Sequence, residues 1–409
     1  MVTVFGLGFV GLTTALGFAD KGLTVFGIDV NKERSEQISA GKVPFFEPHL
    51  DDTLARTLGK TFFVTNDVKA AIKDSQYVFY CVGTPYGENG AADLTYLFSA
   101  LDSTVNCIED DKFRALVIKS TVPPSTTSER VWPYIKGKKG NFGLANNPEF
   151  LREGYCWDDF VNADRIVLGC ADNKTKQMLT ELYKPFGAPI ITVSLNTGEF
   201  IKYLSNTLLA TMISYSNEMA EVASHIGDID IKSAFKTLHM DKRWGGCSMT
   251  SYVYPGCGYG GYCLPKDTNA LLSQSMEKGY TPKILQNVIG TNDNMPALIA
   301  RKIAKVARKD ERIGILGLSF KPGSDDVRDA PSAKIIRALF ELGYSNIVGH
   351  DPIAIGSFKE LYDFDIEYCT SMAEMNADVF VITTAWDEYK GLSGRIVDCR
   401  YCLTNELGE

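Results

Sequence analysis

The chain has 409 residues, which is too long for one ordinary hydrophobic core, so two or three domains are expected. Its hydrophobic content of 45% and charged content of 22% are typical of a soluble globular protein. A net charge of -8 argues against nucleic acid as the main partner, so an anionic ligand would need a local pocket of basic side chains or backbone N–H groups.

The N-terminal sequence MVTVFGLGFVG has no basic segment and no cleavage site, which is unlike a signal peptide. Apolar runs stay shorter than a membrane-spanning helix requires, so no membrane partner is expected. We therefore expect a cytoplasmic protein whose ten cysteines stay reduced. Neither these cysteines nor the four histidines have the spacing of a zinc site, so no metal is expected.

Short apolar runs alternate with helical patterns along the first half of the chain. Six of these runs are expected to form strands: TVFGLG, TVFGID, FFVT, YVFYCVGTP, ALVIKSTV and NFGLANNP. Strands that alternate with helices form a parallel sheet that is covered on both faces. We therefore predict a Rossmann-like, doubly wound α/β domain over residues 1–195.

The first strand runs into a glycine turn of the kind that binds a dinucleotide. Gly6 permits the tight turn, Gly8 leaves room for a pyrophosphate, and Gly11 lets the helix pack closely on the sheet. The helix would present free N–H groups and its positive dipole end to the phosphates. Asp29 ends the second strand, where it can bind a ribose 2′-hydroxyl and would repel a 2′-phosphate. NAD is therefore the expected cofactor, and Arg34 is either a cofactor contact or a solvated helix charge.

A long helical pattern covers about residues 198–226 without proline or internal glycine. Apolar residues lie around much of its circumference, so we expect it to be buried between domains or subunits. The segments DIKSAFKTLH and KDTNALLSQSMEKG continue the helical pattern. We assign residues 196–300 to a central helical connector, and we expect a homodimer formed through the long helix.

The alternation of strands and helices returns at about residue 311, in RIGILGLSF, AKIIRALFELG, NIVGHDP, VFVITTAW and RIVDC. We predict a second Rossmann-like domain over residues 301–409. Its glycine turn, GILGLSF, lacks the dinucleotide spacing, so a second NAD site is one interpretation and binding of another nucleotide is the preferred one. Lys321 and Arg328 follow this turn and are either anion contacts or surface charges.

One cysteine, Cys263, lies in the polar, glycine-rich stretch GYGGYCLPKD rather than in an apolar run. A reactive thiolate needs nearby positive charge and partial access to solvent, and Lys266 and the glycines would supply both. A structural thiol in a loop is the alternative. In an NAD enzyme, a thiol can add to an aldehyde, and the adduct can lose a hydride to give a thioester that water hydrolyses to an acid.

These motifs together resemble the UDP-glucose/GDP-mannose dehydrogenase family of nucleotide-sugar 6-dehydrogenases. The resemblance rests on GLGFVGL, GKVPFFEPHL, VGTP, STVPPSTT, NPEFLREG, DRIVLG, IKYLSN, YPGCGYGGYCLPKD and LSFKPGSDDVRDAPS, in the family's order over nearly the whole chain. It implies two Rossmann-like domains joined by a long central helix, the second holding the substrate's nucleotide. It also implies a four-electron oxidation of a sugar C6 hydroxyl to the acid, with two NAD reduced.

The resemblance implies catalytic roles for Cys263, Lys202, Asn206, Asp267, Glu149 and Thr121. Cys263 would be the nucleophile, Lys202 would stabilise developing oxyanions, and Glu149 would be the general base for thioester hydrolysis. Asp267 would position or activate the water. Lys202 and Asn206 are one helical turn apart and would share a face of the long helix.

The resemblance also implies contacts to the two ligands. The implied cofactor contacts are Gly6, Gly8, Val10, Gly11, Asp29, Arg34, Thr84, Thr121, Glu153, Lys266 and Arg328. The implied substrate contacts are Glu149, Phe150, Leu151, Arg152, Glu153, Lys202, Asn206, Arg243, Tyr252, Val253, Tyr254, Pro255, Gly256, Gly260 and Lys321. Lys321 would meet the diphosphate, and Thr121 would hold water or the nicotinamide.

The stretch DKRWGG departs from the pattern of the UDP-glucose members, which have D-x-R-I-G at this place. Trp244 replaces the isoleucine, and the inserted GCSMTS lengthens the spacing to Cys263.

UDP-glucose is the first expected substrate, and GDP-mannose or a UDP-N-acetylhexosamine is the alternative. Two alternative functions come from other classes: a non-catalytic NAD-binding regulator and a two-electron hydroxyacid dehydrogenase. The first would require a lost nucleophile or lysine, and the second would need neither the thiol nor the second α/β domain.

Overall fold

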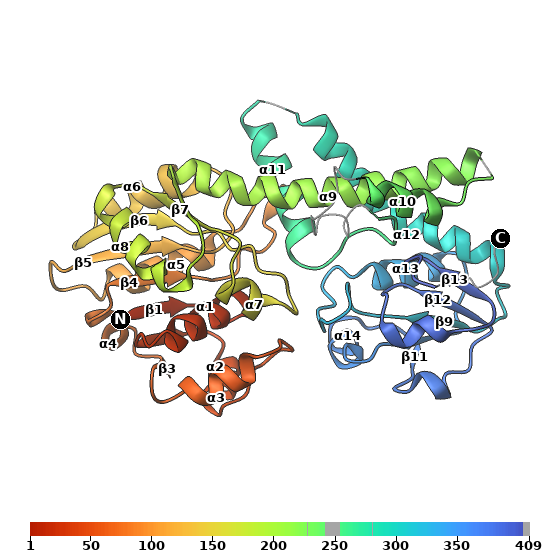
Figure 1. The fold of residues 1–409 in the computed structure, drawn as a ribbon, viewed down its shortest axis with the longest axis horizontal. Coiled ribbons are helices and arrows are strands. Elements are labelled where there is room, and N and C mark those ends of the chain that lie inside the picture. The colour runs from red at the N-terminus through yellow and green to blue at the C-terminus, as the bar shows by residue number, and fades with distance from the viewer. Residues whose placement is uncertain (227, 242–253, 280, 404–409) are drawn as a thin grey trace. The chain divides into compact units, whose positions relative to one another are not determined.

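The computed structural model describes residues 1–226, 228–241, 254–279 and 281–403 (Figure 1). The chain divides into two compact units, Met1–Leu204 and Ser205–Glu409. Each unit contains its own sheet and its own apolar core.

The first unit is built on an eight-stranded sheet with the order β3-β2-β1-β4-β5-β6-β7-β8. Its strands are β1 Val2–Phe5, β2 Val25–Ile28, β3 Phe62–Val64, β4 Tyr77–Tyr80, β5 Phe113–Ile118, β6 Asn141–Asn146, β7 Ile166–Cys170 and β8 Ile190–Val193. Neighbouring strands are parallel except β6 and β7, which are antiparallel. The order of the first six strands is that of a Rossmann fold.

Helices lie on both faces of this sheet (Figure 1). They are α1 Phe9–Asp20, α2 Lys32–Ser39, α3 Leu50–Thr57, α4 Val68–Lys73, α5 Thr95–Val105, α6 Trp132–Lys136, α7 Cys156–Val161 and α8 Asn173–Tyr183. Successive residues of a strand point to opposite faces, so Phe79 enters one apolar cluster while Val78 and Tyr80 enter the other. Both faces are therefore buried, as the near-continuous apolar strands predict.

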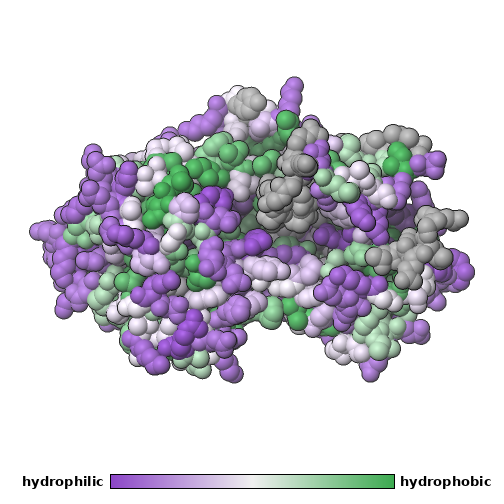
Figure 2. Space-filling view, viewed as in Figure 1, coloured by the Kyte–Doolittle hydropathy of each residue, from purple (hydrophilic) through white to green (hydrophobic). Residues whose placement is uncertain are grey.

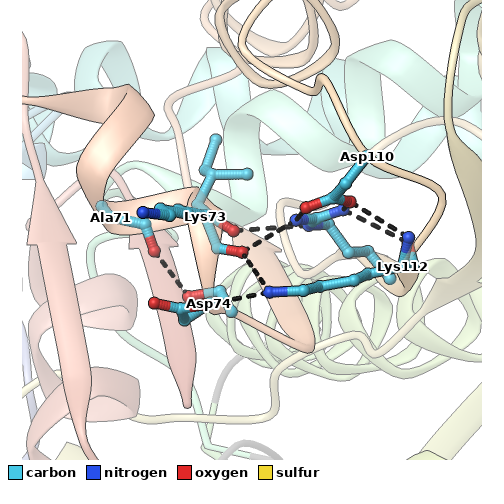
Figure 3. A network of polar contacts seen from close by, with 8 residues as sticks. Ala71, Lys73, Asp74, Asp110 and Lys112 are labelled. Atoms are coloured by element: carbon cyan, nitrogen blue, oxygen red, sulfur yellow. Dashed lines mark hydrogen bonds and ion pairs between the residues drawn. The ribbon is translucent and has the colours of Figure 1, made fainter.

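A polar network fixes the start of β5 to the end of α4 (Figure 3). The buried Arg114 guanidinium donates to both oxygens of Asp110, at 2.7 and 3.1 Å, and to the carbonyl oxygens of Ile72 and Lys73. Lys112 pairs with Asp74 at 3.0 Å beside it. This network lies at the amino end of β5, away from the carboxyl end where Rossmann sheets bind ligands.

Helix α9 is 32 residues long, Leu195–Ile226, and the boundary between the two units falls within it. The sequence predicts this helix, but not the exposure of its apolar side chains within one chain. Phe200, Leu204, Leu208 and Tyr215 are between 46% and 54% exposed. Figure 2 shows hydrophobic residues gathered along the first part of this helix.

The second unit contains a five-stranded parallel sheet with the order β11-β10-β9-β12-β13. Its strands are β9 Ile313–Leu316, β10 Ile347–His350, β11 Glu367–Tyr368, β12 Val379–Ile382 and β13 Ile396–Asp398. Its remaining helices are α10 Ile231–Met240, α11 Cys263–Glu277, α12 Lys283–Val306, α13 Pro331–Glu341 and α14 Ile355–Leu361. The predicted fold class, two Rossmann-like α/β folds, is confirmed.

The second glycine turn is closed by an acid from its own sheet. Asp351 directly follows β10, as Asp29 follows β2, and its Oδ2 accepts hydrogen bonds from the N–H groups of Leu318 and Ser319 at 2.8 and 3.1 Å. The side chain is only 2% exposed. This carboxylate therefore supports the backbone of the second glycine turn.

Among the helices that lie in the described part of the chain, none is long and apolar enough to cross a membrane. Within the same residues, no group of three or more His, Cys, Asp or Glu side chains is arranged to hold a metal ion.

Candidate active site

The dinucleotide turn between β1 and α1 has the geometry that its glycines predict. Gly6 has a φ of +83°, and a Cβ there would lie 2.6 Å from the carbonyl oxygen of Cys81. A Cβ on Gly11 would lie 1.7 Å from the oxygen of Gly6, whereas one on Gly8 would meet nothing within 4 Å. Gly6 and Gly11 thus permit close packing, and Gly8 leaves space at the N-terminus of α1, which fits a pyrophosphate. Val10 lies in the first turn of this helix.

Asp29 braces this turn from the end of β2. Its Oδ2 accepts a hydrogen bond from the N–H of Leu7 at 2.7 Å, and its Oδ1 accepts one from the N–H of Asn31 at 2.8 Å. Arg34 donates to the same carboxylate at 3.0 Å. The structure therefore brings Asp29 and Arg34 together, and the arginine is an ion-pair partner rather than a solvated charge.

Thr84 and Thr121 follow the carboxyl ends of β4 and β5. The hydroxyl of Thr84 donates to the carbonyl oxygen of Thr121 at 2.9 Å, so these two predicted cofactor contacts are neighbours. They lie at the same edge of the sheet as the glycine turn, because the carboxyl ends of parallel strands share one edge.

Glu149 lies in the loop after β6 and forms a buried ion pair with Lys202 of α9. The distance from Lys202 Nζ to Glu149 Oε1 is 2.8 Å, and both side chains are 6% exposed. The other oxygen, Oε2, accepts a hydrogen bond from the N–H of Leu151 at 2.6 Å. The Phe150 ring has Arg165 at 4.2 Å and Lys202 at 5.7 Å from its centroid, so it contributes an electron-rich face to a cationic site.

The rest of the loop after β6 is held by side chains from other parts of the first unit and from α7. Arg152 is exposed and pairs with Asp159 at 2.7 Å. The buried Glu47 accepts hydrogen bonds from the N–H groups of Gly154 and Cys156 at 2.8 and 2.7 Å. These contacts flank Glu153, so the loop has a fixed path on both sides of it.

Cys263 is the first residue of α11 and is partly exposed. A helix N-terminus favours the thiolate form of a cysteine, and so does a nearby ammonium group. The apolar-run cysteines differ, because burial raises the pKa of Cys81 to about 12 and that of Cys170 to about 11. The environment of Cys263 is thus suited to reaction in a way that theirs is not.

Asp267 is completely buried one turn further along α11. The side-chain amide of Asn206 donates to its Oδ2 at 2.5 Å, and Lys266 Nζ pairs with its Oδ1 at 2.5 Å. Burial acts to lower the pKa of Lys266, but the charges of Asp267 and Cys263 outweigh it, so the pKa is raised. The ammonium of Lys266 is therefore stable in its buried position.

The glycines before Cys263 allow close packing of the backbone, whereas the sequence suggested that they give the thiol access to solvent. A Cβ on Gly260 would lie 2.4 Å from the carbonyl oxygen of Asp329, and one on Gly261 would lie 3.1 Å from the ring of Phe320. Pro255 and Gly256 are also buried, and the Gly256 N–H donates to the side-chain oxygen of Asn217. The loop is thus pressed against the segment that follows β9.

That segment carries two predicted anion contacts. Lys321 lies over the Phe320 ring, 5.4 Å from its centroid. Arg328 pairs with Asp326 at 2.7 Å and lies 4.5 Å from the centroid of the Tyr262 ring, which Lys266 also faces at 5.7 Å. The structure therefore brings the predicted cofactor contacts Lys266 and Arg328 together around one ring.

Most of the predicted site residues thus form two groups, one in each unit. Tyr254 is described, and its hydroxyl donates to the carbonyl oxygen of Tyr401 at 3.5 Å. Arg243, Tyr252 and Val253 lie outside the described residues, as does Trp244.

Three buried polar residues that support these groups were not predicted from the sequence: Glu47, Lys119 and Glu199. The sequence signal for two of them is position alone: Glu47 lies inside the motif GKVPFFEPHL, and Lys119 lies two residues before Thr121. Glu199 lies three residues before Lys202 and accepts a hydrogen bond from the N–H of Thr127 at 2.7 Å. Each of the three acts through a partner that is distant in the sequence, which no local pattern reveals.

Three family models match the chain in succession. The NAD binding domain of the UDP-glucose/GDP-mannose dehydrogenase family matches residues 1–187, its central domain matches residues 196–294, and its UDP binding domain matches residues 314–405.

Individual proteins are similar over almost the same length. The chain is 35% identical to the UDP-glucose 6-dehydrogenase TuaD of Bacillus subtilis, over 95% of this chain and 84% of that protein. It is 33% identical to the UDP-glucose 6-dehydrogenase AglM of Haloferax volcanii, over 100% of this chain and 98% of that protein.

Solved structures of nucleotide-sugar dehydrogenases are also similar to this chain over nearly its whole length. A UDP-glucose dehydrogenase from Pyrobaculum islandicum has a TM-score of 0.92 and 34% identity, covering 98% of this chain and 94% of that one. A UDP-D-ManNAc dehydrogenase from Pyrococcus horikoshii has a TM-score of 0.84 and 27% identity, covering 99% and 96%.

Proposed function

This chain belongs to the UDP-glucose/GDP-mannose dehydrogenase family, and from this membership we propose that it oxidises UDP-glucose to UDP-glucuronate. It is an NAD-dependent nucleotide-sugar 6-dehydrogenase, so the expected cofactor and the expected class of substrate are confirmed. One observation carries the finer proposal: two relatives that align over 95% and 100% of the chain, and a structure with a TM-score of 0.92, are named for UDP-glucose.

Cys263 is the proposed nucleophile. The C6 hydroxyl first loses a proton and a hydride and becomes an aldehyde. The thiolate sulfur then bonds to the aldehyde carbon, and loss of a second hydride leaves a thioester. Water breaks the carbon–sulfur bond and releases the acid and the thiolate. Bound NAD supplies the hydride acceptor, so two NADH form per sugar.

Lys202 and Glu149 are proposed to act on the oxygen atoms of this sequence. The Lys202 ammonium would stabilise the oxyanions that form as the alcohol is oxidised and as the thioester is attacked. The Glu149 carboxylate would take the proton of the attacking water. Their 2.8 Å ion pair supports both roles, because it holds the ammonium and the carboxylate side by side in a buried position. Thr121 is proposed to hold that water or the nicotinamide.

Asp267 is proposed to position its neighbours. Both of its carboxylate oxygens already accept hydrogen bonds, one from Asn206 and one from Lys266. A carboxylate that is engaged in this way fixes the direction of its donors, which supports a positioning role more than a role as a base.

The loop that departs from the family pattern supports an alternative substrate. In this alternative, the chemistry is the same, and residues 243–256 and 149–153 would recognise another nucleotide sugar. One similar structure is named for UDP-D-ManNAc. A non-catalytic NAD-binding regulator is disfavoured, because Cys263, Lys202, Asn206 and Asp267 are all present. We also propose a three-part organisation over residues 1–195, 196–300 and 301–409, and a cytoplasmic location.

An end-point count of NADH per sugar tests the function. The panel contains UDP-glucose, UDP-galactose, UDP-N-acetylglucosamine, UDP-N-acetylmannosamine and GDP-mannose. About two NADH with UDP-glucose alone are expected from the thioester mechanism. Two NADH with a different sugar would move the substrate to the alternative, and one NADH would mean that the aldehyde is released and that Cys263 does not act as proposed.

A further inference from the structure

Lys119 is a buried cation that the proposed mechanism does not use. It follows the last residue of β5 and is 4% exposed. Its ammonium donates a hydrogen bond to Asn147 Oδ1 at 2.9 Å and lies 5.7 Å from the centroid of the Phe160 ring. Among the described residues, no carboxylate is close enough to form an ion pair with it. A buried charge with a neutral partner is costly, so its presence calls for a role.

The partner, Asn147, holds the loop that carries Glu149. Its Oδ1 also accepts a hydrogen bond from the Tyr183 hydroxyl at 2.5 Å, and its amide donates to the carbonyl oxygen of Val167 at 2.9 Å. Its backbone N–H donates to the carbonyl oxygen of Ile118, also at 2.9 Å. Asn147 is thus fixed on every polar atom of its side chain, only two residues before the carboxylate of Glu149.

Lys119 also interacts with Glu149 through its charge. The pKa of Lys119 is lowered to about 8, mainly by burial, and the charge of the Lys202 ammonium contributes to this lowering. Cys81 and Glu149 act in the opposite direction. Glu149 therefore has two buried cations near it: Lys202 forms an ion pair with it, and Lys119 interacts with it through charge and through Asn147.

We propose that Lys119 is a positioning residue for thioester hydrolysis, whose ammonium holds Asn147 and keeps the carboxylate of Glu149 aimed at the attacking water. This inference rests on the proposed function, because it assumes that Glu149 is the base for the second half of the reaction. It assigns Lys119 to that half alone, so the first oxidation should not depend on it.

Two variants separate charge from packing. Lys119→Met and Tyr183→Phe each remove one hydrogen-bond donor to Asn147 Oδ1, but only the first removes a charge. We expect Lys119→Met to lower kcat about ten- to hundredfold with little change in KM, and to accumulate the Cys263 thioester, seen by mass spectrometry of the quenched enzyme. Tyr183→Phe should change kcat by less than about threefold and should not accumulate the adduct.

The pH profile gives a second readout. Wild-type turnover should fall as the pH rises through about 8, where Lys119 loses its proton. Lys119→Met should lack this decline, and Asn147→Asp should move it to higher pH, because a carboxylate beside the ammonium favours the charged form. Among the described residues, Cys81, Cys156, Tyr183 and Lys202 are other titratable groups near Lys119 or Glu149, and all four are kept in Lys119→Met and Asn147→Asp.

The outcomes are distinct. Equal losses in Lys119→Met and Tyr183→Phe without adduct, or a decline near pH 8 that survives in Lys119→Met, would overturn the role of Lys119. If Lys119→Met does not fold, Asn147→Asp still tests the role of Lys119, because a decline in turnover that stays near pH 8 in that variant would contradict it. A wild-type enzyme that yields one NADH per sugar and no Cys263 adduct would instead overturn the proposed function.

Discussion

At the scale of single residues, the contrast between Cys263 and the buried thiols leads to a direct prediction. Replacing Cys263 with serine should leave NAD affinity unchanged and abolish acid formation, because an alcohol is not ionised at neutral pH and cannot replace the thiolate. NAD titration and product analysis check the two parts separately. Cys170→Ser is the matched control, since burial raises the pKa of that thiol to about 11 and it should not react. Full turnover by Cys263→Ser would exclude the thioester mechanism.

Residues with a local reason for their identity could be predicted from the sequence. Gly6, Gly8 and Gly11 have the backbone geometry that their spacing implies, and Asp29 ends its strand as expected. Arg34 was left open between a cofactor contact and a solvated helix charge, and its pairing with Asp29 was not predicted, because a sequence does not show which partner a long side chain takes. Lys119 could not be assigned, since its partner Asn147 directly follows the neighbouring strand β6 and is distant from it in the sequence.

At the scale of elements, Glu199 joins α9 to the π-helical turn Thr127–Val131, in the segment after β5. Burial is the main cause that raises the pKa of Glu199 from 4.5 to about 7, although hydrogen bonds from Thr127 oppose it. A carboxyl whose pKa is higher in the folded protein stabilises it below pH 4.5, and this stabilisation is lost as the pH rises to about 7.

Replacing Glu199 with glutamine should therefore flatten the loss of unfolding free energy between about pH 4.5 and 7, the range that the pKa shift defines. Denaturant unfolding of both proteins across this range measures the difference. The exposed Glu181 provides the control, because Glu181→Gln should give a curve parallel to the wild type. Parallel curves for Glu199→Gln would show that its carboxyl does not carry the pH dependence.

Most elements could be predicted from periodicity alone, including the strands β1 to β6 and the long helix. The last two strands of this sheet, β7 and β8, were not predicted, because IVLGC and IITV are short apolar runs that also fit a core loop. Helix α12 was not predicted either, since it contains Pro296 and Gly290, which normally interrupt helices. Its apolar face packs on the second core and overrides these local preferences.

At the scale of the whole molecule, the exposed side chains of α9 support the proposed homodimer. Phe200, Leu204 and Leu208 are spaced by four residues and form one apolar stripe, which a monomer would leave in water. Light scattering at micromolar concentration should give twice the chain mass of 45.1 kDa. The double variant Leu204→Glu, Leu208→Glu should give the mass of one chain. Ile284→Glu, at an exposed position of α12, should not change the mass, and a monomeric wild type would refute the dimer.

The two acids that end the second strand of each sheet have a consequence for redesign. Asp29 braces its glycine turn and is also the proposed ribose contact, so exchanging it to admit NADP would remove the acceptor of the Leu7 and Asn31 N–H groups. Asp351 closes its turn and also accepts hydrogen bonds from the N–H groups of Ile353 and Ala354, so exchanging it would loosen two segments of the second sheet. Cofactor preference in this protein is therefore coupled to loop stability, and an engineer would need to change several residues at once.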